Sequence, residues 1–211
     1  MRPWRMTVAC LHTAASNIPL FEAAAARHGL TLRHALRPDL LAGAEAAGGA
    51  TPAILAETRA ELARALPGAS ALLLTCSTLG PALEGATWPI PALRVDAALA
   101  RAAMARPGRL LVLCAVETTL EPTRALFAAA APAGKAWELR LVPGAWARFK
   151  AGDAEGYAAA IRAAAVGAET VALAQASMAV AGGGARVMTV PDAAMAALGT
   201  TLGGTLSAAS R

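Results

Sequence analysis

The chain has 211 residues, of which 56% are hydrophobic and 16% are charged. This balance excludes a disordered chain and supplies a core for one large domain or two small ones. The mean hydropathy is +0.49, but charged residues, prolines and glycines interrupt each apolar stretch before the roughly 20 residues of a spanning helix. The net charge of +5 comes mostly from scattered arginines without interleaved aromatic residues. We therefore expect neither a membrane nor a nucleic acid as a partner.

The cysteines indicate a reducing compartment. Cys10, Cys76 and Cys114 are an odd number of thiols in three different contexts, too few for a disulfide scaffold and without metal-ligand spacing. The apolar stretch at residues 6–11 is shorter than the core of a secretory signal and has the character of a strand. The expected location is the cytoplasm.

The first half of the chain alternates apolar runs with alanine-rich helical patterns. Strands are predicted at residues 6–11, 30–36 and 71–75, with a helix at 18–28. Residues 42–50 are small and are expected to be flexible. Thr51 and Pro52 are typical of a helix start, and that helix is expected to end near Leu66.

The second half repeats this order after a crossover segment at residues 88–94. The pattern predicts helices at 95–105, 121–131 and 154–166, and strands at 109–116, 136–142 and 170–174, with a further strand at 186–190. Residues 200–211 are expected to be partly disordered. Alternating strands and helices in each half predict an α/β fold with two parallel sheets. The expected lobes are residues 1–92 with 189–211, and residues 95–188.

Polar residues gather where the predicted strands end. Parallel α/β sheets bind ligands outside the carboxyl ends of their strands, and unpaired N–H groups at helix starts favour carboxylates or phosphates. The corresponding segments are residues 12–16, 75–80, 117–119 and 175–178. No glycine-rich dinucleotide motif and no phosphate-loop lysine follows a strand, so a nucleotide site is not expected.

Cys76 is the residue with the strongest chemical signal. It follows a buried strand at the start of a turn, where N–H donors can stabilise a thiolate, so a nucleophile or base and a small core residue are equally plausible readings. Cys10 and Cys114 lie inside apolar runs and are expected in the core. His12, at a strand end, is read either as a proton donor or acceptor or as a structural histidine. His28 and His34 are expected at the surface.

Five segments resemble the aspartate/glutamate/hydantoin racemase superfamily, in particular its small uncharacterised members. They are His12-Thr13, Thr75-Cys76-Ser77-Thr78, Arg94-Val95-Asp96, Glu117 to Thr123, and Leu173 to Ala179. The resemblance covers residues 5–195. It implies two Rossmann-like lobes related by a pseudo-two-fold axis, an active-site cleft between them, and neither a cofactor nor a metal. Racemases of this kind use one cysteine from each lobe.

The resemblance places Cys76 at the first-lobe cysteine, with Ser77 and Thr78 as the polar residues that follow it. The second-lobe cysteine is missing, because Gln175, or Ala176 if the alignment slips by one, stands in its place. Two-base racemisation needs an acid or base on each face of the substrate, and neither side chain titrates near neutrality. This departure argues against amino-acid racemisation.

The leading hypothesis is a cofactor-independent, single-cysteine enzyme that acts on a small carboxylate by isomerase or decarboxylase chemistry. The alternative is a non-catalytic protein that binds or reports a metabolite through the same fold. The expected partner is a small-molecule carboxylate; the sequence does not decide the oligomeric state, and a homo-oligomer is one alternative. The expected catalytic residues are Cys76 and His12, and the expected substrate-binding residues are Thr13, Ser77, Thr78, Glu117, Thr118, Thr119, Gln175 and Ser177.

Overall fold

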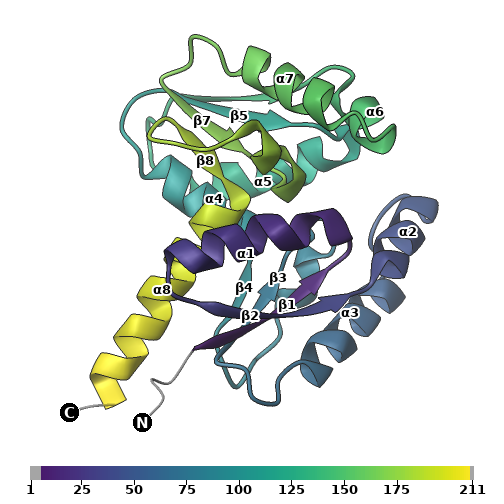
Figure 1. The fold of residues 1–211 in the computed structure, drawn as a ribbon, viewed down its shortest axis with the longest axis vertical. Helices are drawn as coiled ribbons and strands as arrows, with labels where there is room; N and C mark the ends of the chain where they lie inside the picture. Colours follow the sequence, from purple (N-terminus) through teal and green to yellow (C-terminus); the bar gives the residue numbers. More distant parts are fainter. Residues whose placement is uncertain (1–5, 210–211) are drawn as a thin grey trace. The chain divides into compact units, whose positions relative to one another are not determined.

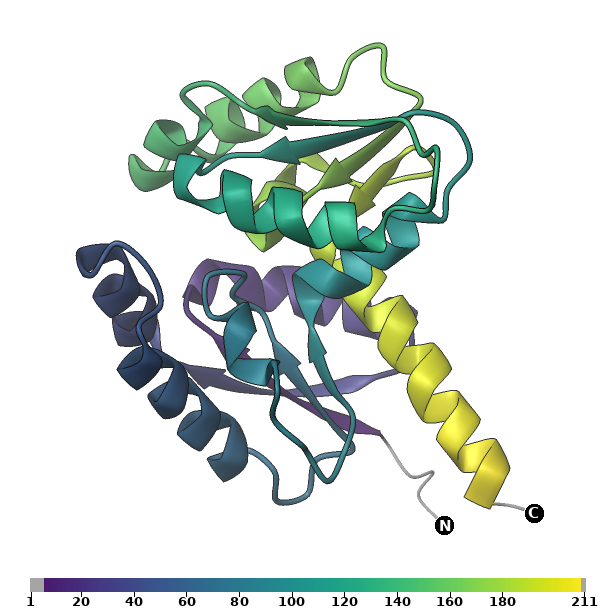
Figure 2. The ribbon, with the colours of Figure 1, turned by 180° about the vertical axis from the view of Figure 1, so that it is seen from behind.

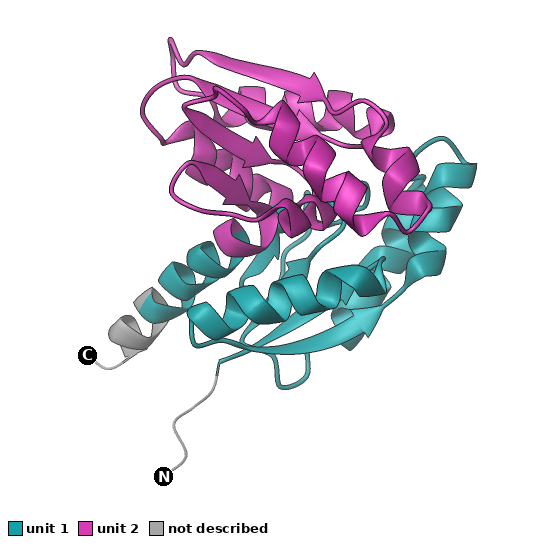
Figure 3. Cartoon of the chain, turned by 45° about the horizontal axis from the view of Figure 1, so that its top comes forward, with its two compact units in different colours: residues 1–95, 194–211 teal, residues 96–193 magenta. Residues whose placement is uncertain are grey.

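The computed structural model describes residues 6–209, and describes side chains as far as residue 203. The chain divides into two compact units, residues 1–95 with 194–211 and residues 96–193 (Figure 3). Each unit contains a four-stranded parallel sheet with helices packed on it, which confirms the predicted α/β class. The two sheets have corresponding strand orders, so the second half repeats the topology of the first.

Unit 1 is built on the strand order β2-β1-β3-β4. Its helices cover both faces of the sheet, with α1 on one face and α2 and α3 on the other (Figure 1). The inner strand β3 is an unbroken run of buried apolar residues, as expected for a parallel strand covered on both sides. The elements are β1 (Thr7–His12), α1 (Ile18–Arg27), β2 (Thr31–Leu36), α2 (Pro38–Ala46), α3 (Pro52–Arg64), β3 (Ala71–Leu74) and β4 (Ala92–Arg94).

Unit 2 has the order β6-β5-β7-β8. Its two inner strands, β5 and β7, are again fully buried. The helices α6 and α7 pack beside one another, as both ribbon views show (Figures 1 and 2). The elements are α4 (Val95–Met104), β5 (Leu110–Cys114), α5 (Leu120–Ala130), β6 (Trp137–Leu141), α6 (Ala145–Lys150), α7 (Ala154–Ala164), β7 (Thr170–Leu173) and β8 (Val187–Thr189).

Apart from the helix α6, which was not predicted, three segments differ from the sequence-based expectation. Residues 42–46 of the segment expected to be flexible form the end of α2, because Leu40 and Ala44 lie one turn apart and bury one face against the core. The crossover segment ends in β4, which adds a fourth strand beside β3. The C-terminal segment expected to be partly disordered forms the last part of α8 (Val190–Ala209), while residues 210–211 lie outside the described residues.

Local hydrogen bonds stabilise the helix α8, although its content of glycine, serine and threonine predicted partial disorder. Its start is capped by Thr189, whose hydroxyl accepts from the N–H of Asp192 at 3.3 Å. Further along, the hydroxyls of Thr200 and Thr201 donate to carbonyls one turn earlier, at 3.1 and 2.9 Å, so their polar groups are satisfied within the helix. Among the described residues, no helix has the length and apolar character needed to span a membrane.

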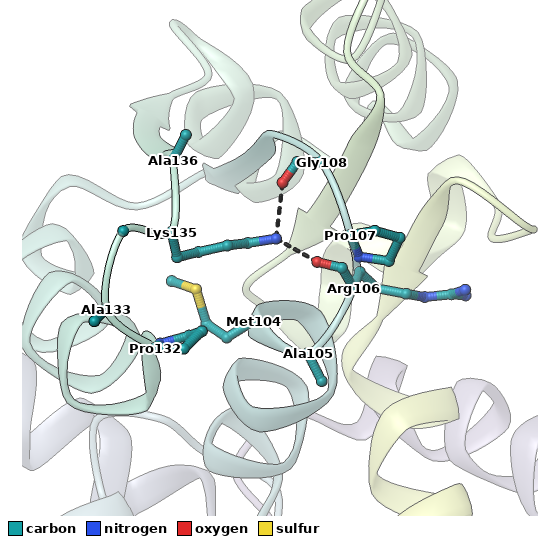
Figure 4. A pocket seen from close by; sticks show the side chains of 10 residues that line it. Met104, Ala105, Arg106, Pro107, Gly108, Pro132, Ala133, Lys135 and Ala136 are labelled. Carbon is teal, nitrogen blue, oxygen red and sulfur yellow. Dashed lines mark hydrogen bonds between the residues drawn. The ribbon is translucent and has the colours of Figure 1, made fainter.

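A surface pocket of unit 2 lies at the amino ends of β5 and β6 (Figure 4). The Lys135 ammonium donates to the carbonyl of Gly108 at 2.8 Å and also to that of Arg106. These bonds tie the loop before β5 to the loop before β6. The pocket is at the opposite end of the sheet from the strand ends expected to carry function, and it contains none of the expected site residues.

Replacing Gly108 by alanine should destabilise the protein more than replacing Gly134. Both glycines have left-handed backbones, with φ of 75° and 76°, so each substitution costs about 1 kcal/mol in backbone strain. A Cβ at Gly108 would also overlap the Glu169 carboxylate, which accepts from the Arg109 N–H at 3.0 Å, whereas Gly134 faces open space. Losing that bond should add about 1 kcal/mol. Equal losses of unfolding free energy in urea would contradict this account.

Candidate active site

The expected residues of unit 1 meet at one edge of its sheet. β1 and β3 are parallel neighbours with Leu11 opposite Leu74, and the Thr75 N–H extends the ladder by donating to the Leu11 carbonyl at 3.1 Å. Both strands end here, so Thr13 and Cys76 follow side by side at the carboxyl edge of the sheet. This is the edge at which parallel α/β sheets bind ligands.

The Cys76 thiol is surrounded by hydrogen-bond donors. The hydroxyls of Thr13 and Thr78 donate toward its sulfur, as do the backbone N–H groups of Thr78 and Leu79. Each of these bonds lowers the pKa, but burial is the largest effect and raises the pKa of Cys76 above its usual value. The residue is 8% exposed. In the free protein the thiol is therefore protonated at neutral pH.

We expect Cys76 to be alkylated faster than Cys10 and Cys114 in the folded protein. It is 8% exposed, whereas the other two are 1% and 0% exposed, and it has more donors aimed at its sulfur than either. Because its pKa is raised and the thiolate is the reactive form, its rate should rise about tenfold per pH unit from pH 6 to 9 without a plateau. Peptide mass spectrometry after brief alkylation measures this, and faster labelling of Cys114 would contradict it.

His12 is the last residue of β1 and is fully buried. Its Nδ1 lies 3.0 Å from the Thr75 hydroxyl, and its Nε2 lies 2.9 Å from Nδ1 of His34. Burial, and to a smaller extent the neighbouring His34, lower the pKa of His12 to about 4. Both ring nitrogens thus have partners within unit 1, and a catalytic role for His12 stays a prediction.

Gln175 leads the expected residues of unit 2. It follows β7, and its Oε1 accepts from the Ala115 N–H at 2.6 Å while its Nε2 donates to the Thr119 hydroxyl at 3.3 Å. The Thr119 hydroxyl in turn donates to the Val116 carbonyl at 2.6 Å. The amide therefore joins the ends of β5 and β7 and supplies no titrating group.

The other expected residues of unit 2 are less closely gathered. Glu117 and Thr118 are exposed in the short turn before α5, whereas Thr119 in the same turn is buried. Ser177 lies in the turn after β7 and shares a 2.9 Å hydrogen bond with the Tyr157 hydroxyl of α7. The structure thus brings Gln175 and Thr119 into contact, and it leaves Glu117 and Thr118 at the surface, open to a ligand.

Strand register relates Cys76 to Gln175 within the repeated topology. Leu74 ends β3 opposite Leu11, and Leu173 ends β7 opposite Leu113. Cys76 and Gln175 each stand two residues beyond these ends, so Gln175, rather than Ala176, occupies the equivalent position. That both residues act on one substrate stays a prediction.

Two buried polar atoms that the sequence did not single out lack hydrogen-bond partners among the described residues. Asn17, in the turn between β1 and α1, has a buried Oδ1 without a hydrogen-bond partner among the described residues. Trp88 packs against the apolar cluster that contains Cys76 and Leu79, and its Nε1 is likewise buried and unpartnered. Buried polar atoms normally have partners, so these are candidate contacts for a ligand. An asparagine in a turn and a lone tryptophan carry no sequence signal for such a role.

Solved structures resemble this chain although sequence comparisons find nothing. No family model and no curated protein matches it. An aspartate racemase from Picrophilus torridus superposes with a TM-score of 0.73 at 12% identity, covering 94% of each chain. The chain shares the fold of this racemase. A glutamate racemase from Bacillus anthracis gives a TM-score of 0.68 at 13% identity over 95% of this chain and 82% of its own. An allantoin racemase from Pseudomonas fluorescens gives 0.60 at 14% identity over 93% and 90%.

The fold shared with these racemases agrees with the resemblance inferred from the five short segments. At 12 to 14% identity, the superpositions establish the arrangement of strands and helices. The chemistry must be argued from the side chains, because one fold can host many activities.

Proposed function

We propose that the chain is a cofactor-independent enzyme that acts on a small carboxylate through the single thiol of Cys76. The observation that carries the proposal is the setting of this thiol at the carboxyl edge of β1 and β3, with two hydroxyls and two backbone N–H groups directed at it. Such donors can also hold a substrate carboxylate. Thr13, Ser77 and Thr78 are the proposed binding residues of unit 1.

The remaining expected residues, which belong to unit 2, are also proposed to bind the substrate. Thr118 and Glu117 are exposed for contact with a ligand, and Thr119, Gln175 and Ser177 supply hydroxyl and amide groups at the ends of β5 and β7. Asn17 adds an unpartnered acceptor in unit 1. These assignments rest on the chemistry of the strand ends and not on the activities of the superposed racemases.

A protonated thiol is better suited to deliver a proton than to remove one. Because burial raises the pKa of Cys76, the free protein holds the S–H form. In a decarboxylation the bond between the α-carbon and the carboxylate breaks. Neutral carbon dioxide leaves, and the electron pair of the bond stays on the α-carbon as a carbanion. Cys76 then gives its proton to that carbon, and the thiolate regains a proton from water. This chemistry needs one thiol, and Cys76 supplies it.

The raised pKa also keeps the binding hypothesis open as a second candidate. A thiol that stays protonated is not an activated nucleophile, and the hydroxyls around it suffice to bind an anion. In that case the chain binds a carboxylate metabolite without converting it. Turnover separates the two candidates.

The test is a panel of malonate, methylmalonate, maleate, aspartate and glutamate in deuterium oxide, followed by proton NMR. An enzyme is supported if the wild-type protein and Cys114→Ser convert or exchange one substrate and Cys76→Ser does not. Cys114 is a suitable control because it is a fully buried thiol outside the proposed site. A shift of the thermal midpoint by a panel member without any turnover would support binding alone. Turnover that survives Cys76→Ser would overturn the assignment of the thiol.

A further inference from the structure

Three metal-ligating side chains meet on one face of the sheet of unit 1. Cys10 and His12 are two residues apart on β1, so they project to the same face, and His34 lies on β2 in register with Cys10. The Cys10 sulfur and the ring nitrogens of the two histidines all lie within 4.8 Å of one another. This face is the one covered by α1, because the ring of Phe21 packs against that of His12 at 5.5 Å.

Each histidine is already oriented by a hydrogen bond on its far nitrogen. Nδ1 of His12 faces the Thr75 hydroxyl at 3.0 Å, and that hydroxyl can donate to the Leu11 carbonyl at 2.9 Å. Nε2 of His34 donates to the Glu22 carboxylate at 2.8 Å. Metal-binding histidines are typically held in this way by an oxygen acceptor, which sets the tautomer and turns the other nitrogen toward the ion.

The remaining nitrogens point at each other. Nε2 of His12 and Nδ1 of His34 are 2.9 Å apart, a separation at which the two rings share one proton. Two nitrogens bound to one tetrahedral zinc ion at about 2.0–2.1 Å each lie about 3.3 Å apart. A small outward shift of the rings would therefore let an ion replace the shared proton.

The fold itself does not require polar groups at these places. By strand register, Cys10, His12 and His34 correspond in unit 2 to Val112, Cys114 and Leu139. Unit 2 thus fills the equivalent region with two apolar side chains and one thiol, which donates to the Thr123 hydroxyl at 3.6 Å. Unit 1 therefore places three metal-ligating groups where the same fold in unit 2 accepts mostly apolar side chains, and this difference favours a bound ion.

We propose that Cys10, His12 and His34 bind a zinc-class divalent metal ion. One thiolate and two imidazoles are the donors that zinc prefers, whereas calcium and magnesium require oxygen ligands. On binding, the Cys10 thiol loses its proton to solvent, and the shared proton moves to Nδ1 of His12, which then donates to Thr75. His34 keeps its Nε2 proton on Glu22. No oxidation or reduction is involved.

The charges balance in the bound state. The ion contributes two positive charges, and the Cys10 thiolate and the Glu22 carboxylate contribute one negative charge each. A neutral assembly is what a largely buried site tolerates best. The fourth ligand is a water molecule that approaches past His34 and Glu22, whose side chains are 19% and 51% exposed. The ion joins β1 to β2 and stabilises the folded form of unit 1, because a preformed site is absent from the unfolded chain.

The experiment uses the full chain without a polyhistidine tag, treated with chelator and reductant and then titrated with Co²⁺. We expect one equivalent to produce a thiolate-to-cobalt charge-transfer band with the visible spectrum of a tetrahedral site. Cys10→Val and His34→Leu should abolish the band. Both variants carry the residues found at the equivalent places in unit 2, which the same topology accommodates there. Cys114→Ser and Cys76→Ser should retain the band, which separates this proposal from the proposed activity.

A second measurement covers a variant that folds poorly. Zn²⁺ should raise the thermal unfolding midpoint of the wild-type protein and of Cys114→Ser, and should leave that of Cys10→Ser unchanged. The proposal is overturned if the wild-type protein gives no charge-transfer band with one equivalent of Co²⁺. It is also overturned if the band survives in His34→Leu or disappears in Cys76→Ser.

Discussion

Incubation of either enantiomer of aspartate or glutamate with the wild-type protein is expected to produce no inversion. A two-base racemase removes the α-proton from one face and returns a proton from the other, and a positioned acid or base accounts for about 10²–10⁴-fold of the rate. Gln175 stands at the position of unit 2 that corresponds to Cys76. Its amide is occupied by the Ala115 N–H and the Thr119 hydroxyl, and it has no proton of suitable acidity.

Exchange and inversion are measured separately in deuterium oxide, by NMR and by chiral chromatography. Solvent deuterium entering with retention of configuration would agree with one base acting from one face. Cys76→Ser is the matched control and should remove such exchange. Inversion by the wild-type protein that persists in Gln175→Ala would contradict the single-thiol mechanism. His12 would then be the first candidate for the second acid or base.

Replacing Leu72 by alanine is expected to lower the free energy of unfolding by about 2–5 kcal/mol. Leu72 lies on the inner strand β3, is fully buried, and belongs to the apolar cluster that joins the sheet to α2 and α3. Removing its side chain loses transfer free energy and leaves a cavity that strands paired on both sides cannot close by moving.

Leu36→Ala is the matched substitution for this prediction. Leu36 ends the edge strand β2 and is 43% exposed, so its loss should cost about 0.5 kcal/mol. Urea unfolding followed by circular dichroism compares the two variants. Comparable losses for Leu72→Ala and Leu36→Ala would show that the core of unit 1 is not centred on β3.

The sequence alone predicted the class of fold and, in chain order, every described strand except β4. Continuous apolar runs such as residues 71–74 and 170–173 indicate strands buried on both faces, and such strands occur in parallel α/β sheets. Local signals also placed the start of α3, where the Thr51 hydroxyl accepts from the Ile54 N–H at 3.4 Å. The alanine-rich helix α2 was harder to predict, because it lacks a clear alternation of polar and apolar residues and depends on packing.

The candidate site was predicted as residue types at strand ends, and the tertiary structure decided how those residues are connected. The sequence could not choose between Gln175 and Ala176, whereas strand register relates Gln175 to Cys76. The direction of the Cys76 pKa shift followed from burial, which outweighs the local donors that the sequence suggested.

The contact between His12 and His34 is likewise a result of the tertiary structure and not of the local sequence. His34 was expected at the surface, and His12 was interpreted either as a proton donor or acceptor or as a structural histidine. The two residues are 22 positions apart in the chain, so nothing in the sequence indicated that their rings meet. Pairing of β1 with β2 sets Cys10 opposite His34 and brings the three side chains together on one face. Sequence periodicity determines which residues of a strand share a face, but only pairing between strands determines which residues of different strands become neighbours.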